Sequence, residues 1–402
     1  MKTKQTILII LILLVTAIIV FAVYKRFDLK KEKWNPKPEE NIVAEGELFD
    51  YNIVHLVNEE NTNYMISPYS MAYALTILKN GADGETKKQI EKALKNYNLD
   101  KTINIKDRIA ISNALFIKNE YKNDINNNYI TNIRNDFDSE IIFDDFLSPK
   151  PLNDWTYNKT YGMIDKVVDQ IDKDFVLGII NAIAIDVEWK NQFIESYTNK
   201  KIFNKIDGTT KEVDMMHDSD NVTYISNNNA KGIVRDYKKY NDVELEFIAI
   251  MPNDNIKEYI NKFDKAELDS LLNNKRTNDS RTEISLSIPK FKFDYDYKNF
   301  MEDLKKLGIK DAFDKDIANF KPMLNDNSLL ELYVGEAVHK AHIDLSEYGT
   351  KAAAVTYFGM YKNTAMPMET EKINIVFDRP FLFIIKEKNK DNVWFFGTVY
   401  EP

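Results

Sequence analysis

The order of the predicted elements is the feature that most constrains the fold of this 402-residue chain. Segments 68–79 and 85–94 have helical periodicity, and 298–307 follows later as another amphipathic helix. Short segments rich in Val, Ile, Phe and Tyr are typical of strands, and they span 178–187, 243–251, 283–293 and 393–399. Helices first and strands later predict an α+β domain, in which helices pack around large, mainly antiparallel β-sheets.

An apolar stretch near the N-terminus indicates a membrane address. Residues 7–23 carry no charge and a single hydroxyl group. As a helix they would reach about 26 Å, close to the ~30 Å hydrocarbon core of a bilayer. We predict a signal anchor or transmembrane helix at 1–24, a charged linker at 25–40, and one domain at 41–402. The protein would then be a single-pass protein of the cell membrane, with its folded domain outside the cytoplasm.

Cleavage of this stretch as a secretory signal peptide is the alternative. Lys2 and Lys4 precede the apolar residues, as in the positively charged region of a signal peptide. A signal peptide usually has a shorter apolar run and ends at small residues, and neither property is clear here. If cleavage occurs, the protein is secreted.

Composition excludes several classes of function. The chain has 54 Lys and Arg against 63 Asp and Glu, a net charge of −9, which argues against nucleic acid as a partner. It has no cysteine, which excludes disulfides, thiolate metal sites and a cysteine nucleophile. With only four histidines, no metal centre and no cofactor are expected. A cysteine-free exported protein also suggests a prokaryotic source.

Known catalytic patterns are missing from the sequence. It contains no G-x-S-x-G, H-E-x-x-H or phosphate-binding G-x-x-x-x-G-K motif. Ser67 and His339 could be imagined as a nucleophile and its base, but Ser67 stands where a serine caps a helix. His339 lies in a strand-like segment, where a buried, hydrogen-bonded histidine is the ordinary interpretation. The sequence therefore predicts that the protein is not an enzyme.

Segment 347–368 resembles neither an ordinary loop nor an ordinary helix. After Gly349, small uncharged residues occupy every second position. They are Thr350, Ala352, Ala354 and Thr356. Their shared face could enter a packed sheet without overfilling it, while Lys351 on the other face would stay at solvent. An alanine-rich helix is the alternative, although Gly359 interrupts it. We interpret the segment as one able to become a strand.

Nearly all of 41–402 resembles the serpin family of serine protease inhibitors. The motifs that carry the resemblance are NYMISPYSMAYAL (63–75), GADGET (81–86), NALF (113–116), NAIAIDVEWKNQF (181–193), VDMM (213–216), HKA (339–341), EYGTKAAAVT (347–356), DRPFLF (378–383) and FGTV (396–399). Each motif alone is weak, but their order and spacing are specific. The chain departs from the family pattern at Ile185 and Val187, and at Lys351, where a glutamate is usual.

The resemblance implies a serpin fold with an exposed reactive-centre loop. It also implies a monomeric inhibitor that traps a serine or cysteine endopeptidase as a covalent complex, when the cleaved loop inserts into the central sheet. The implied hinge residues are Glu347, Gly349, Thr350, Ala352, Ala353, Ala354 and Thr356. Their small size predicts an inhibitor, and a non-inhibitory binding or chaperone-like protein is the alternative.

The position of the reactive bond follows from counting forward from the hinge as in the family. The count places the bond at Asn363–Thr364, with Lys362–Asn363 as the alternative. Lys362 would suit a trypsin-like protease, Asn363 an asparagine-preferring one, and Tyr361 leaves chymotrypsin-like targets open.

Other residues match the family's shutter, a hydrogen-bond cluster beneath the sheet, and the tryptophan near the insertion point. The shutter residues are Ser67, Ser70, Asn181 and His339, and the tryptophan is Trp189. Plain core packing is the alternative role for all of them.

Overall fold

The structure is a computed structural model that describes residues 48–57, 61–95, 97, 99, 105–172, 175–350 and 371–402. All of these residues belong to the unit Ile42–Pro402. The predicted anchor at 1–24 and the linker at 25–40 lie outside them. Among the described residues, no helix is both long and apolar enough to cross a membrane.

The predicted helices are present, with small shifts of their ends. The described α-helices are α2 (Phe49–Val57), α3 (Pro68–Gly81), α4 (Gly84–Leu94), α5 (Asn127–Phe137), α6 (Lys150–Lys159), α7 (Ile256–Ile260), α8 (Lys265–Leu272) and α9 (Phe300–Lys306). The start of α3 illustrates the local cause, because the Ser67 hydroxyl accepts a hydrogen bond from the Ser70 backbone N–H and Pro68 occupies the first turn. Ser67 therefore caps this helix, as the sequence predicts.

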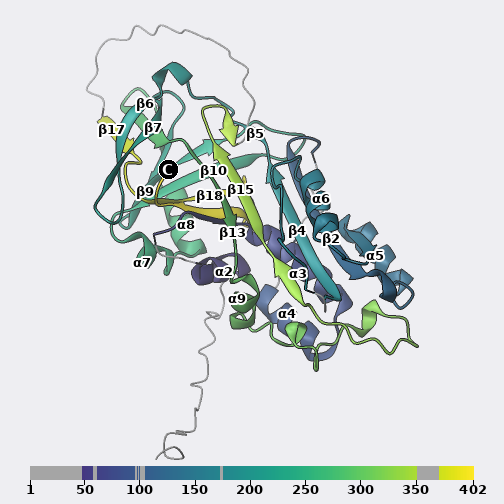
Figure 1. Ribbon diagram of the computed structural model, residues 1–402. Helices are drawn as coiled ribbons and strands as arrows, with labels where there is room; N and C mark the ends of the chain where they lie inside the picture. Colours follow the sequence, from purple (N-terminus) through teal and green to yellow (C-terminus); the bar gives the residue numbers. More distant parts are fainter. Residues whose placement is uncertain are drawn as a thin grey trace, which may run out of the picture. The chain divides into compact units, whose positions relative to one another are not determined.

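The largest sheet of the described chain has seven antiparallel strands, among them β9, β10 and β18 (Figure 1). Its strands in spatial order are β1 (Tyr64–Ile66), β19 (Val393–Val399), β18 (Phe381–Glu387), β10 (Leu245–Pro252), β9 (Ala230–Asp236), β8 (Thr223–Ser226) and β11 (Lys275–Thr277). Strands β10 and β19 are buried along their whole length, so both of their faces are apolar and covered.

A second sheet has four strands. They are, in order, β17 (Glu371–Val376), β12 (Thr282–Pro289), β7 (Thr210–Asp218) and β6 (Asn199–Asn204). Strands β12 and β17 are parallel, while the other pairs of this sheet are antiparallel.

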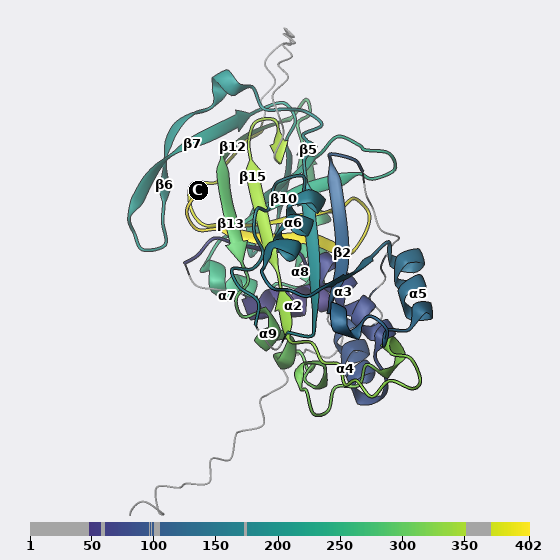
Figure 2. The same cartoon turned by 45° about the vertical axis from the view of Figure 1, so that its right-hand side comes forward.

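Two further four-stranded ladders lie end to end. One is β14 (Glu336–Val338), β4 (Leu177–Ile185), β2 (Ile109–Lys118) and β3 (Glu140–Asp144); the other is β13 (Phe291–Asp296), β15 (Lys340–Leu345), β16 (Gly349–Thr350) and β5 (Val187–Glu188). Only His339 separates β14 from β15, and only Asp186 separates β4 from β5. Strands β4 and β15 consequently run side by side, as both views show (Figures 1 and 2).

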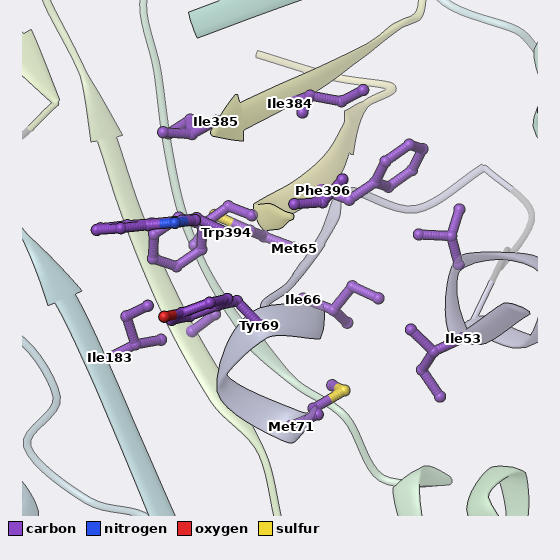
Figure 3. Close-up of a cluster of buried hydrophobic side chains, with 14 of the residues drawn as sticks. Ile53, Met65, Ile66, Tyr69, Met71, Ile183, Ile384, Ile385, Trp394 and Phe396 are labelled. Carbon is purple, nitrogen blue, oxygen red and sulfur yellow. The ribbon is translucent and has the colours of Figure 1, made fainter. Parts of the chain in front are cut away.

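Helices cover both faces of the ladder that contains β2 and β4. Helix α3 packs on one face, and its residues join the main core. In that core Tyr69 of α3 stacks on Trp394 of β19, with ring centroids 5.6 Å apart (Figure 3). Helix α6 packs on the other face, where Leu152 and Trp155 form a separate buried cluster with residues of β2 and β4.

The α+β serpin fold expected from the sequence is confirmed, but two predicted strands are divided. The segment 283–293 forms β12 and β13 in different sheets. Pro289, which has no backbone N–H, ends β12, the Lys290 backbone N–H still donates to the Asp214 carbonyl in the register of β12 and β7, and from Phe291 the chain pairs with β15 instead. The segment 178–187 breaks at Asp186, whose backbone N–H donates to the Arg108 carbonyl.

Candidate functional site

The central feature of the candidate site is a seam between β4 and β15. Within the described chain, residues 181–185 of β4 pair with β2 on one side and with no strand on the side of β15. Residues 340–344 of β15 likewise pair only with β13. We call this interrupted ladder the seam. Backbone groups along it could accept a further strand, which main-chain hydrogen bonds would hold on both sides.

Each end of the seam is closed by a short ladder. At one end β14 pairs in parallel with β4, from Glu336–Gly178 to Val338–Ile180. At the other end the two-residue strand β16 lies between β15 and β5, antiparallel to both. Thr350 is paired with Leu345 on one side and with Val187 on the other. The first residues of the predicted hinge therefore already occupy this end of the seam, which we call the hinge end.

Gly349 fits this position because no other residue would. Its φ is +154°, and a Cβ atom would lie 2.0 Å from the Val187 carbonyl oxygen. An alanine would therefore collide with the backbone of β5. The predicted hinge glycine thus lets the chain enter the ladder.

The Thr350 side chain is buried next to two stacked aromatic rings, those of Tyr237 and Trp189. It is 2% exposed, and its hydroxyl lies 2.6 Å from the Tyr237 hydroxyl. The Tyr237 ring stacks on Trp189 with centroids 4.4 Å apart, and burial raises the pKa of Tyr237 well above its ordinary value. Trp189 also donates two hydrogen bonds of 2.9 Å, from its backbone N–H to the Tyr348 carbonyl and from its indole N–H to the Ser346 carbonyl.

Glu347 fixes the base of the hinge as a buried carboxylate. Its side chain is 2% exposed, lies 2.9 Å from the Lys290 ammonium and accepts a 2.7 Å hydrogen bond from the Thr198 hydroxyl. Burial alone would raise the pKa of Glu347, but the hydrogen bonds from Lys290 and Thr198 outweigh it and leave this pKa below its ordinary value. The carboxylate therefore stays ionised and holds the hinge base to β6 and β13 through neighbouring residues.

The far end of the seam contains the predicted shutter residues. The Ser67 backbone N–H donates to Nε2 of His339 at 3.1 Å, while the Ser67 hydroxyl accepts from Ser70. His339 is 2% exposed, and burial lowers its pKa to about 3, so the ring is neutral. Asn181 donates to the Asn113 side chain at 2.5 Å across β4 and β2. The contact between Ser67 and His339 does not involve the hydroxyl, and it lacks the geometry of a nucleophile and its base.

The predicted site residues thus fall into three groups. The first group lies together at the hinge end of the seam and consists of Glu347, Gly349, Thr350 and Trp189. The second group lies along or beneath the seam and consists of Ser67, Ser70, His339 and Asn181. Ala352, Ala353, Ala354 and Thr356 of the hinge, and both candidate reactive bonds at 362–364, lie outside the described residues. In the part of the chain that the structure describes, no three histidine or carboxylate side chains gather as metal ligands.

Sequence reasoning missed several residues that hold this site. Tyr237, Lys290 and Thr198 contact the hinge from other sheets and loops, and Asn113 pairs with Asn181. Their contacts span up to 149 residues, and no local pattern predicts such a pairing. Asn113 had a usable signal, because it stands in a motif resembling the family's and on a buried strand.

Comparisons with known proteins agree with this architecture. The family model described as Serpin (serine protease inhibitor) matches residues 47–402. A serpin-like protein of Methanosarcina acetivorans is 31% identical over 87% of this chain and 84% of its own length. The leukocyte elastase inhibitor of Xenopus laevis is 27% identical over 90% of this chain and 100% of its own length.

Solved structures show the same fold. The crystal structure of a thermophilic serpin, tengpin, in the native state has a TM-score of 0.76 and 31% identity to this chain, and the match covers 92% of this chain and 95% of that one. The match of the family model to nearly the whole described unit, together with this likeness, shows that the chain belongs to the serpin family.

Proposed function

We propose that this serpin is a suicide-type inhibitor of a serine or cysteine endopeptidase. The observation that carries the proposal is the strand β16, in which Gly349 and Thr350 are already paired with β15 and β5 at the end of an open seam. A chain that continues from Thr350 in the same direction would run antiparallel to both borders of the seam. Such a strand would add main-chain hydrogen bonds on both sides.

The register of β16 assigns a neighbour to each loop residue in the inserted state. Extending its pairs by two residues places Ala352 between Ile343 and Ile185, and a further two places Ala354 between Ala341 and Ile183. Thr356 then meets His339 and Asn181. The border residues beside Ala352 and Ala354 are buried in the main core, and His339 and Asn181 are buried polar residues, so small side chains on the incoming strand suit the space between them.

Cleavage of the reactive bond would start the reaction. The nucleophile of the target protease attacks the carbonyl carbon of Asn363, forms the acyl bond and releases Thr364 as a free amine. The segment before Asn363 is then free to fill the seam and to carry the attached protease with it. Lys362–Asn363 is the alternative bond, and the reaction has the same form there.

Denaturing gels of the full chain, incubated with trypsin-like, chymotrypsin-like and asparagine-preferring proteases, test the proposal. A complex that survives boiling is the expected result. The mass of the released C-terminal peptide locates the bond: a peptide that begins at Thr364 supports the hinge count, and one that begins at Asn363 supports Lys362. Complete cleavage without any complex would contradict the proposal and favour a non-inhibitory binding or chaperone-like protein.

We also propose that residues 1–24 hold the protein in the cell membrane as a single-pass anchor, with the serpin domain outside the cytoplasm. The uncharged stretch 7–23 supports this proposal. Carbonate-washed membranes should retain the full-length chain, and external protease should reach the domain in intact cells. A soluble product whose N-terminus lies after residue 24 would instead show signal cleavage and secretion.

A further inference from the structure

A polar cavity is lined in part by Lys190, which follows Trp189 in the chain, and by Arg235, whose guanidinium lies over the Trp189 ring. Its volume is about 200 Å³, below the ~300–1,000 Å³ of sites for drug-sized ligands, so its occupant would be a small molecule. Three of its lining residues form one row across neighbouring strands, because Thr277 of β11 pairs with Thr223 of β8, and Thr223 pairs with Val234 of β9. The remaining lining residues are Lys190, Asn191, Asp220, Asn221, Val222, Arg235, Asp236 and Asn278.

Arg235 connects this cavity to the hinge. Its side chain is 4% exposed and forms a 2.7 Å ion pair with Asp218, so its charge is already balanced. The guanidinium carbon lies 3.8 Å from the centroid of the Phe193 ring and 5.6 Å from that of Trp189. The backbone N–H groups of Phe193 and Trp189 donate to the carbonyls of Glu347 and Tyr348, both at 2.9 Å. The lining residues Lys190 and Asn191 lie between these two donors in the chain.

Two opposite charges at the cavity remain available to a ligand. Among the described residues, the Lys190 ammonium forms one ion pair, a 3.9 Å contact to Asp236, and its side chain is 64% exposed. Lys388 already binds that Asp236 carboxylate, at 3.1 and 3.2 Å. Asp220 is exposed and has no ion-pair partner among the described residues. A ligand could therefore bind one group of each sign without displacing a strong ion pair.

The neutral lining groups favour a polar ligand. The side-chain amide of Asn278 donates to the Ser219 carbonyl, but its Oδ1 is buried and accepts no hydrogen bond from any described group. Because this oxygen is buried, it is not available to a ligand in the cavity. Asn191, Asn221 and the two threonines add donors and acceptors around the same space.

We propose that this cavity binds a small zwitterion, a free α-amino acid with a polar side chain, and that its occupancy stabilises the base of the hinge. The ligand carboxylate would bind Lys190, and its ammonium would bind Asp220. Because Lys190 and Asn191 lie between Trp189 and Phe193, a ligand held there would restrain both donors to the hinge. The site goes beyond the proposed inhibition, and its binding can be measured without any protease.

Calorimetric titration of the full chain with free serine, threonine, asparagine and glutamine, one at a time, tests the site. At least one should bind, and its matched analogues lacking the α-amino or the α-carboxylate group should bind about ten-fold to a hundred-fold more weakly, because each loses a charge-assisted hydrogen bond. Equal binding of either analogue, or no binding of any of the four amino acids, would overturn the proposal.

Variants separate the two charges. Asp220→Asn should weaken binding of the amino acid but leave binding of the analogue without an amino group unchanged. Lys190→Gln should also weaken binding of the amino acid, but it should leave binding of the analogue without a carboxylate unchanged. Lys200→Gln is the matched control, because Lys200 is similarly exposed, at 56%, and pairs with Asp214 on β7 away from the cavity. An effect of the control as large as that of Lys190→Gln would contradict the assignment.

Hydrogen exchange tests the connection to the hinge. With the amino acid bound, the Trp189 and Phe193 amides should exchange several-fold more slowly, and Asp220→Asn should abolish the difference. Binding without any change at these two amides would overturn the connection to the hinge. This readout needs neither loop cleavage nor a target protease, so its failure is distinguishable from a failure of the proposed inhibition.

Discussion

Removal of the Lys290 ammonium is expected to destabilise the native state through Glu347. In Lys290→Met the Glu347 carboxylate, 2% exposed, keeps the hydrogen bonds from Thr198 and from its own backbone N–H but loses its cationic partner. Removing one partner of a fully buried ion pair costs about 3–5 kcal/mol, because the other charge stays buried and unpaired. The Lys290 side chain is 39% exposed, and water can replace part of its contact. We therefore expect a loss of about 1–3 kcal/mol in the free energy of unfolding.

Urea unfolding at neutral pH measures this loss, and Lys292→Met is the matched control. Lys292 lies two residues further along the chain and pairs with Asp344 at the same 2.9 Å, but the two side chains are 64% and 32% exposed. Its removal should cost at most about 1 kcal/mol, as is usual for exposed pairs. Similar losses in the two variants would refute the argument from burial.

A double mutant isolates the buried charge. Glu347→Gln can still accept the hydrogen bond from Thr198, but it carries no charge that needs Lys290. Adding it to Lys290→Met should therefore recover part of the lost stability. If the double mutant is less stable than Lys290→Met alone, the uncompensated carboxylate is not the cause of the loss.

Three further predictions concern pH and the loop. Burial lowers the pKa of His339 from 6.5 to about 3, so its contribution to stability is present above pH 6.5 and is lost as the pH falls toward 3. The free energy of unfolding should fall by ~1.4 kcal/mol per pH unit in this range. His339→Gln should remove this pH dependence from the urea midpoints. Burial raises the pKa of Asp50 from 3.8 to about 7, so stability is lost as the pH rises through 7. Asp50→Asn should therefore add about 2–4 kcal/mol to the free energy of unfolding at pH 8, measured with urea, and the absence of any gain would contradict this prediction. In the proposed insertion Lys351 lies between Asp344 and Asp186, so Lys351→Glu should lower the ratio of trapped complex to cleaved product on gels.

Local patterns predicted the elements of this fold well, because their causes are local. The cap of α3 by Ser67 and the alternation in β15 depend on residues within a few positions of each other. The division of 283–293 between two sheets was not predicted. Pro289 is the only local signal for it, because the Lys290 backbone N–H still follows the register of β12 and β7, and the change of sheet depends on the pairing of Phe291 with the distant Leu345.

The candidate site was predictable in its residue types but not in its contacts. Alternation indicated that Thr350 would face inward, and its side chain is buried. The Tyr237 hydroxyl that contacts it comes from the residue after β9, and no spacing in the sequence brings the two together. For Ser67 and His339 the sequence suggested a contact, but only the coordinates show that the backbone N–H, and not the hydroxyl, makes it.

The register of β16 also indicates where insertion would meet resistance. The seam is open as far as the position of Thr356, and the next residue, Tyr357, would fall between Val338 and Ile180, which are paired with each other. Insertion beyond Thr356 must therefore separate β14 from β4. The side chain of Tyr357 would point to the opposite face from Thr356, toward the buried cluster where Ile180 packs with Trp155 of α6. A tyrosine added to a packed cluster costs free energy unless α6 moves. The main barrier of the proposed insertion is therefore expected at this step, because Gly349 and Thr350 are already paired and the residues that share their inward face, Ala352, Ala354 and Thr356, are small.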